Sequence, residues 1–174
     1  TNIKIIDTPG LIPEKRISDF LEPKEALALI PNGEINRKTF KPDNDQVFFF
    51  DGLMWFRVIM KEDEKNPIFS AFASKDIKFH VTKEDRVEDL LNKDFFTFPS
   101  KTEKDAYYQK MKKETVTVEA FEEMAISGLG WINVKRGPLT IELSYPENVK
   151  IVIRNGIINP KIRRNNEKIK KEND

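Results

Sequence analysis

The residues with the clearest chemical potential form a short motif near the start of the chain, Asp7-Thr8-Pro9-Gly10, directly after the aliphatic run at 2–6. Asp, Pro and Gly are common turn residues, so one interpretation is an ordinary turn that ends a strand. The same spacing is typical of the Asp-x-x-Gly element of GTPases, whose glycine N–H donates to the γ-phosphate. Glycine suits this role because no side chain keeps its backbone away from the phosphate. These four residues leave both interpretations open.

The other motifs that a GTPase needs are absent from the sequence. A phosphate-binding loop ends in Gly-Lys-Ser/Thr, and this triplet occurs nowhere in the 174 residues. The guanine-binding Asn-Lys-x-Asp is also missing, because Asn92-Lys93 is followed by Asp one position too early. Thr82-Lys83-Glu84-Asp85 is a looser match, but no phosphate loop lies between it and Asp7–Gly10. We therefore expect this chain alone to be inactive as a GTPase.

Composition excludes several other kinds of site. The chain has a net charge of +1, no cysteine and one histidine, which excludes thiolate catalysis, disulfides and Cys-ligated zinc. Its acidic residues show no paired spacing that would indicate acid–base catalysis. No apolar stretch approaches the roughly 18 residues that span a bilayer. These observations predict a soluble, cytoplasmic protein of about one domain, with no membrane partner.

Positive charge is concentrated toward the C-terminus. Residues 1–127 hold 20 basic and 24 acidic groups, whereas residues 128–171 hold 10 basic and 3 acidic groups. This asymmetry indicates a polyanionic partner such as RNA, although a basic tail that only aids solubility has the same composition. The candidate phosphate-binding residues lie on an expected strand edge beside Phe40, at an expected hairpin tip at 135–138 and on the last strand: Arg37, Lys38, Lys41, Lys135, Arg136 and Arg154.

Aromatic side chains could add base stacking to such phosphate contacts. The candidates are Trp55, Phe56 and Trp131. Trp131 lies among apolar residues of an expected strand, which favours core packing over stacking. The run at 48–50, three consecutive phenylalanines, is typical of a central strand covered on both faces. His80 has no partner motif, and we expect it to be structural.

The elements that must position these residues change character along the chain. Short helices are expected at 14–21 and 23–30, because Pro23 suits a first helical turn and Pro31 with Gly33 ends a helix. From residue 35, alternating apolar and polar residues predict antiparallel strands with one buried face. Strands are expected at 46–51, 53–60, 67–74, 77–82, 115–120, 126–134, 141–145 and 149–154, one helix at 84–93 and an irregular, mobile connection at 94–113.

Several longer stretches carry a family resemblance. They are Asp7–Leu11 and the segments 30–40, 48–53, 127–134 and 153–158, of which Ser-Gly-Leu-Gly-Trp at 127–131 is the most specific. Over roughly residues 3–160 the chain resembles the YqeH-type circularly permuted GTPases. In that family Asp-x-x-Gly is the last nucleotide motif, which would account for the missing motifs. We therefore expect a longer protein, of which this chain is the C-terminal portion.

The resemblance implies an α+β fold in three parts. Residues 1–24 would be the strand-and-switch remnant of a P-loop G domain, in which Asp7, Thr8, Pro9 and Gly10 bind nucleotide. Asp7 would hold Mg²⁺ through water. Residues 25–160 would form a mainly antiparallel β-rich domain that resembles the trp RNA-binding attenuation protein. Residues 161–174 would be a basic, disordered tail.

The implied function belongs to the intact protein. It would bind GTP or GDP with Mg²⁺ and hydrolyse GTP during assembly of the small ribosomal subunit. The β-rich domain would contact rRNA or a ribosomal protein, without DNA specificity, and this chain alone would hold no nucleotide tightly. Leu11 stands where Ras-like enzymes place a water-orienting Gln, a task that an aliphatic side chain cannot perform. Two alternatives stay open: a stand-alone RNA-binding module, or a structural interaction domain.

Overall fold

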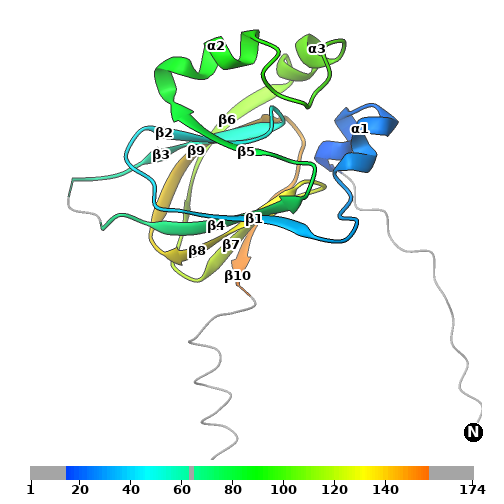
Figure 1. Cartoon of the computed structure of the whole chain (residues 1–174). Helices are drawn as coiled ribbons and strands as arrows, with labels where there is room; N and C mark the ends of the chain where they lie inside the picture. The colour runs from blue at the N-terminus through cyan, green and yellow to red at the C-terminus, as the bar shows by residue number, and fades with distance from the viewer. Residues whose placement is uncertain (1–14, 63–64, 157–174) are drawn as a thin grey trace, which may run out of the picture.

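A computed structural model describes residues 15–62 and 65–156 as two facing five-stranded sheets (Figure 1). Sheet A has the strand order β1-β4-β8-β7-β10, and sheet B has the order β5-β2-β3-β9-β6, with antiparallel pairing throughout. The predicted antiparallel β-rich domain is therefore confirmed. The predicted strand at 2–6 and the tail from residue 161 lie outside the described residues.

The elements have the following bounds. Sheet A contains β1 (Ile35–Phe40), β4 (Ile68–Ser74), β7 (Glu122–Ile126), β8 (Gly130–Arg136) and β10 (Ile151–Asn155). Sheet B contains β2 (Gln46–Phe50), β3 (Met54–Ile59), β5 (Phe79–Lys83), β6 (Met111–Val118) and β9 (Leu139–Pro146). The helical segments are η1 (Ile17–Phe20), α1 (Pro23–Ala28), η2 (Glu84–Arg86), α2 (Val87–Asn92) and α3 (Lys104–Tyr108).

Three predicted elements are wrong. The expected single strand at 126–134 is two strands, because a positive φ of 76° at Gly128 reverses the chain between β7 and β8. The expected mobile connection at 94–113 contains α3 and the start of β6, and its Tyr107 side chain is only 2% exposed. The expected hairpin tip at 135–138 joins strands of different sheets, so β8 and β9 do not pair.

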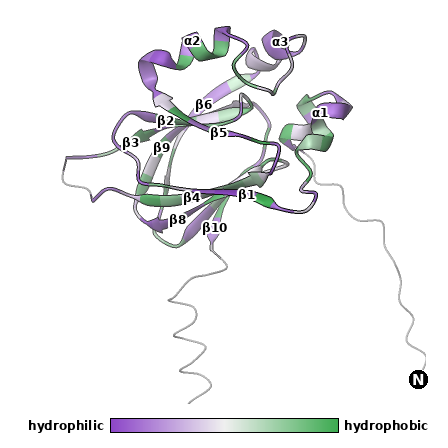
Figure 2. Ribbon diagram, in the orientation of Figure 1, coloured by the Kyte–Doolittle hydropathy of each residue, from purple (hydrophilic) through white to green (hydrophobic). Residues whose placement is uncertain are grey.

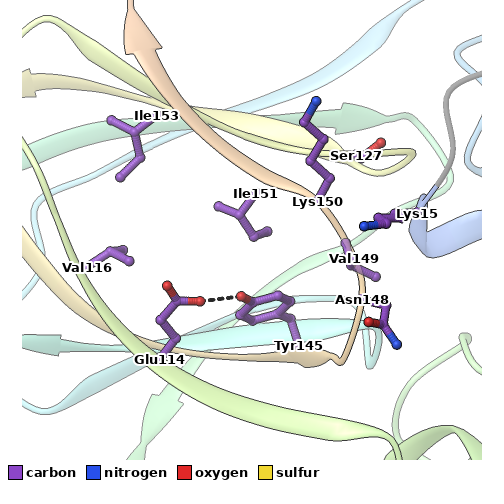
Figure 3. A pocket seen from close by; sticks show the side chains of 10 residues that line it. All are labelled: Lys15, Glu114, Val116, Ser127, Tyr145, Asn148, Val149, Lys150, Ile151 and Ile153. Carbon is purple, nitrogen blue, oxygen red and sulfur yellow. Dashed lines mark hydrogen bonds between the residues drawn. The ribbon is translucent and has the colours of Figure 1, made fainter.

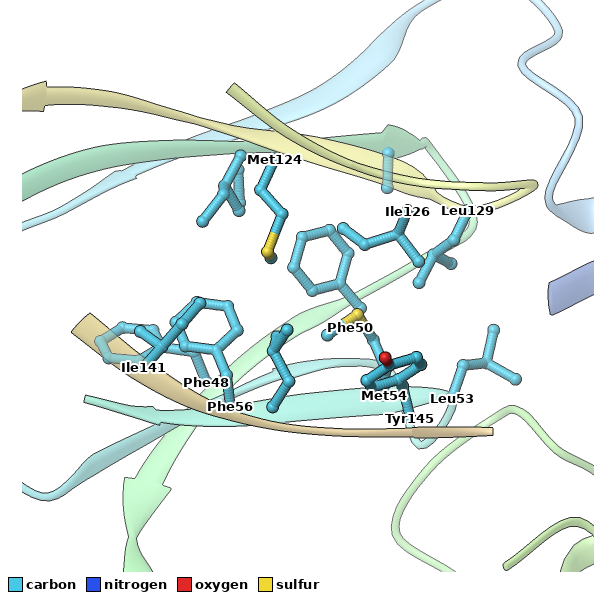
Figure 4. Close-up of a cluster of buried hydrophobic side chains, with 14 of the residues drawn as sticks. Phe48, Phe50, Leu53, Met54, Phe56, Met124, Ile126, Leu129, Ile141 and Tyr145 are labelled. Atoms are coloured by element: carbon cyan, nitrogen blue, oxygen red, sulfur yellow. The ribbon is translucent and has the colours of Figure 1, made fainter. Parts of the chain in front are cut away.

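The hydrophobic core lies between the two sheets (Figure 4). Phe48 and Phe56 of sheet B stack with ring centroids 5.5 Å apart, and Phe69 of sheet A meets Phe48 edge-on at 5.1 Å. Figure 2 shows hydrophobic and hydrophilic stretches along the strands. In β3, buried and partly exposed residues alternate, as expected for a strand with one face in the core. Phe56 is fully buried, so the prediction that it could stack on a base is wrong.

The outer face of sheet B is covered by the segment that contains α2 and α3 (Figure 1). Phe49 stacks on Trp55 of the neighbouring strand at 5.3 Å and on Phe96 of the covering segment at 4.8 Å. Tyr108 meets Trp55 edge-on at 5.9 Å. The prediction that the strand at 48–50 is covered on both faces is confirmed, and Trp55 belongs to this covered layer.

One buried carboxylate fixes the covering segment to sheet B. Asp51 lies in the β2–β3 turn and is 1% exposed. Its Oδ1 accepts hydrogen bonds from the N–H groups of Gly52 at 3.1 Å, Thr97 at 2.8 Å and Phe98 at 3.0 Å. Buried N–H groups need such partners, so Asp51 joins the hairpin turn to a segment more than 40 residues away in sequence.

The environment of His80 predicts a pH-dependent contribution to stability. Its ring meets Phe95 edge-on at 4.6 Å, and burial, with a smaller contribution from Lys38, lowers the pKa of His80. The unfolded chain therefore binds a proton at higher pH than the folded chain, and stability falls as pH drops below about 6.5. We expect urea unfolding at pH 7.5 and 5.5 to show a smaller loss of stability for His80→Gln than for the unsubstituted protein. Equal losses would contradict this assignment.

Candidate nucleic-acid interface

The chain enters the described part at Lys15, five positions after Gly10 of the Asp7–Gly10 motif. The motif itself lies outside the described residues, so its nucleotide-binding role stays a prediction. The Lys15 carbonyl accepts a hydrogen bond from the Lys150 N–H at 2.9 Å, and the Ile17 N–H donates to the Ser127 carbonyl at 2.8 Å. The Ile17 side chain is fully buried in the core of the β-rich domain. We call residues 15–21 the linker segment.

The β7–β8 turn is shaped to receive the linker segment. A Cβ atom at Gly128 would come within 2.6 Å of Arg16 Cβ and 3.1 Å of Ser18 Oγ, so only glycine lets the two backbones approach this closely. Asp19 completes the arrangement by accepting hydrogen bonds from the Arg16 N–H at 2.9 Å and from its guanidinium at 2.7 Å. The hydrogen bond from the Arg16 side chain lowers the pKa of Asp19. The most specific stretch of the family resemblance therefore forms the docking site for the linker.

Two of the six predicted phosphate-binding residues share the outer face of sheet A, and a third lies at one end of that sheet. The Arg37 guanidinium lies over the Phe72 ring, 5.6 Å from its centroid. Arg154 lies at the opposite edge of the sheet, with its Nε 3.5 Å from a Glu123 carboxylate oxygen. Lys135 is exposed at the end of β8, where the pairing with β4 has a register shift. This face therefore presents cations at its two edges and at one end.

The other three predicted cations lie elsewhere. The Lys38 amine is 5.5 Å from the centroid of the Phe40 ring, on the opposite side of β1 from Arg37. Lys41 follows β1 and is exposed. The Arg136 Nε donates to the Asn66 carbonyl at 2.7 Å, which fixes it beside the β3–β4 connection. The structure thus divides the predicted RNA-binding set into two groups.

Trp131 lies on the same outer face as Arg37, and the prediction that it packs in the core is wrong. Ile132 and Val134 of the same strand are fully buried, so alternation turns Trp131 outward. Its indole stacks on the Phe72 ring with centroids 4.7 Å apart and an angle of 5° between the planes. Sequence reasoning did not single out Phe72, although the alternation at 69–73 places it on the face opposite Phe69.

A pocket of about 800 Å³ opens between the edge strands β6 and β10 (Figure 3). Its inner wall is formed largely by Val116, Ile151 and Ile153, and the Tyr145 hydroxyl donates a hydrogen bond to Glu114 at its base. Burial, with a smaller contribution from the bond to Glu114, raises the pKa of Tyr145. Within residues 15–62 and 65–156, no group of three or more His, Asp or Glu side chains could hold a metal ion.

The helices that the structure describes are too short or too polar to cross a membrane. Their contribution is local: α1 lies beside one end of the two sheets, and α2 and α3 cover sheet B (Figure 1).

Comparison with known proteins adds a family match. Residues 66–157 match the family described as "YqeH-like, C-terminal". The "Uncharacterized protein YqeH" of Bacillus subtilis is 25% identical over 157 residues, which cover 88% of this chain and 42% of that protein. "Nitric oxide-associated protein 1" of Mus musculus is 25% identical over 161 residues, covering 84% of this chain and 23% of that protein. The chain thus spans less than half the length of each relative.

Proposed function

From the premise that this chain belongs to the YqeH-like family, we propose that it is the C-terminal part of a GTP-binding and GTP-hydrolysing factor for assembly of the small ribosomal subunit. Its β-rich domain contacts RNA of that subunit. GTP and Mg²⁺ bind the intact protein, with Asp7 on the magnesium side and the Gly10 N–H on the γ-phosphate. The chain alone binds neither GTP nor GDP tightly.

The observation that carries this proposal is the docked linker segment. Five positions separate Gly10 from Lys15, whose carbonyl already bonds to Lys150 of the β-rich domain. Loss of the γ-phosphate on hydrolysis releases the glycine contact in GTPase switches. A movement at Gly10 would therefore act almost directly on the linker, and through the Ile17–Ser127 hydrogen bond on the β7–β8 turn.

Hydrogen exchange on the intact protein tests this coupling. With a non-hydrolysable GTP analogue and with GDP, we expect different protection at residues 14–40 and at the Ser127–Gly130 turn. Identical protection in the two states would contradict the proposed switch. A fluorescent GTP analogue titrated into the present chain is the companion measurement, and micromolar binding would contradict the assignment of the phosphate loop to another part of the protein.

The cations of sheet A predict salt-dependent RNA binding. Neutralising Arg37, Lys135 and Arg154 together with glutamine should weaken binding of a single-stranded RNA and reduce the slope of log K against log salt by about 2, because each lost phosphate contact contributes about 0.7. Fluorescence anisotropy at several KCl concentrations measures this slope.

A matched triple variant controls for net charge alone. Lys93, Lys101 and Lys104 lie on or beside the helices that cover sheet B, away from the outer face of sheet A. Their replacement by glutamine removes the same charge and should leave the slope nearly unchanged. Equal effects of the two triple variants would show that RNA responds to overall charge and not to this face.

A further inference from the structure

Each sheet carries a stacked pair of aromatic rings on its outer face, and the two pairs differ in what covers them. On sheet B, Phe49 and Trp55 stack at 5.3 Å, and Phe96 lies on Phe49 at 4.8 Å. On sheet A, Phe72 and Trp131 stack at 4.7 Å, and no third ring of the described residues lies on either of them. Phe72 and Trp131 remain partly exposed. The second pair thus lacks the aromatic cover that the first has.

The Phe72–Trp131 pair is part of a longer row across sheet A. Strand pairing places Arg37 opposite Phe72, Phe72 opposite Trp131, and Trp131 opposite Ala125 of β7. The centroid spacing of 4.7 Å equals the spacing of neighbouring strands, so the rings stand side by side on consecutive strands.

The row of rings ends at Ala125, and we call the place above this residue, beside the Trp131 indole, the slot. Ala125 occupies the position where the next ring would stand, and Val152 of β10 follows it. The methyl group of Ala125 is too short to cover the indole of Trp131. A methyl group therefore stands where the row would place the next ring, and the side of the indole toward β7 has no aromatic partner on that strand.

The charges around this slot favour an anionic occupant. The outer face of sheet A carries Arg37 and Arg154, Lys135 lies at its end, and its paired positions include the single carboxylate of Glu123. This carboxylate lies 3.5 Å from Arg154 and 3.4 Å from the Asn133 amide. It offsets one of the three cations, so the face and its end keep a net positive charge. A flat aromatic group attached to phosphates matches both the slot and the charges.

We infer that this slot binds an unpaired base of single-stranded RNA, stacked on the Trp131 indole above Ala125, with the neighbouring phosphates on Arg154 and Lys135. The inference rests on the proposed function for RNA as the partner and specifies where and how RNA is held. Aromatic side chains stack on any base, since every base has a flat π-face. The slot therefore recognises single-stranded character and not a particular sequence.

Tryptophan fluorescence can observe this slot directly. The chain has two tryptophans, so a Trp55→Phe background leaves Trp131 as the sole reporter. Oligoadenylate should quench the Trp131 emission on binding, whereas inorganic polyphosphate, which has charge but no bases, should bind without quenching it. Polyglutamate tests for an acidic protein partner instead of RNA. If polyglutamate quenches the Trp131 emission as strongly as oligoadenylate does, the inference is overturned in favour of a protein ligand.

Two variants separate the slot from general RNA affinity. Ala125→Leu fills the space, and Trp131→Ala removes the stacking surface; each should weaken oligoadenylate binding about ten-fold and leave polyphosphate binding unchanged. Ala106→Leu, at an exposed position of α3, is the matched control. Circular dichroism and thermal unfolding identify any variant that does not fold, and Trp131→Phe should restore most of the affinity.

The possible results distinguish a failure of the slot from a failure of RNA binding itself. If oligoadenylate binds with normal affinity to Trp131→Ala and Ala125→Leu, the slot is wrong while RNA binding stands. If the unsubstituted chain binds neither oligoadenylate nor polyphosphate, both the slot and the proposed RNA contact are wrong.

Discussion

Replacing Gly128 by alanine is expected to release the linker segment and to lower the free energy of unfolding by about 3 kcal/mol. The new Cβ would lie 2.6 Å from Arg16 Cβ and 3.3 Å from the Ile17 nitrogen, so the two backbones must separate. Ile17 then leaves the core, and burial of such a side chain contributes about 2 kcal/mol. The positive φ of 76° adds about 1 kcal/mol of strain. Urea unfolding measures the total.

Gly33 provides the control for backbone strain. Its φ is +91°, yet a Cβ there would meet no atom within 4 Å. Gly33→Ala should therefore cost only about 1 kcal/mol and leave the linker docked. Hydrogen exchange at the Ile17 and Lys150 amides reports docking, and both should lose protection in Gly128→Ala alone. Equal stability losses and unchanged protection in the two variants would refute the docking role of the β7–β8 turn.

Removal of the Asp51 carboxylate should have a comparable effect on the other side of the domain. Asp51→Ala leaves the N–H groups of Thr97 and Phe98 without their acceptor, at about 1–2 kcal/mol each. We expect a total loss of about 3 kcal/mol in the free energy of unfolding. The segment that covers Phe49 and Trp55 should loosen before global unfolding, and the emission of Trp55 should shift to longer wavelength.

Two further variants distinguish the loss of the hydrogen-bond acceptor at position 51 from the loss of the carboxylate charge and from the effect of removing any aspartate. Asp51→Asn keeps an oxygen at the acceptor position and tolerates the positive φ of 49°, so its loss should stay near 1 kcal/mol. Asp85→Ala, at an exposed position, should change stability by less than about 0.5 kcal/mol. A loss in Asp51→Asn as large as in Asp51→Ala would mean that the carboxylate charge, and not the hydrogen-bond geometry, fixes the segment.

Local signals predicted much of the fold. Asp51-Gly52 between two aromatic runs indicated the hairpin of β2 and β3, because these residues favour the backbone conformations of a tight turn. Alternation predicted β9 and β10 closely, and Pro23 marked the first turn of α1. Such features depend on neighbours within a few residues, which is why a sequence reveals them.

The predictions from sequence failed where contacts between residues far apart in the chain determine the structure. Residues 126–134 are mostly apolar, and the docking of residues 16–18 on Gly128 is the distant contact that accompanies the turn there. The residues at 94–108 are polar enough to suggest a mobile loop, but Asp51 and Phe49 hold them in place. Which face of β8 bears Trp131 depends on the sheet to which the strand belongs, and short-range spacing does not contain that information.

The buried position of Ile17 sets the smallest piece of this protein that can be produced with an intact interior. A fragment that begins at residue 25, at the domain border suggested by the sequence, would discard Ile17 and leave a hole in the cluster that also contains Leu129 and Val149. It would also free the Ser127 carbonyl and the Lys150 amide that the linker now satisfies. Recombinant fragments intended for crystallisation or spectroscopy should therefore start upstream of Lys15.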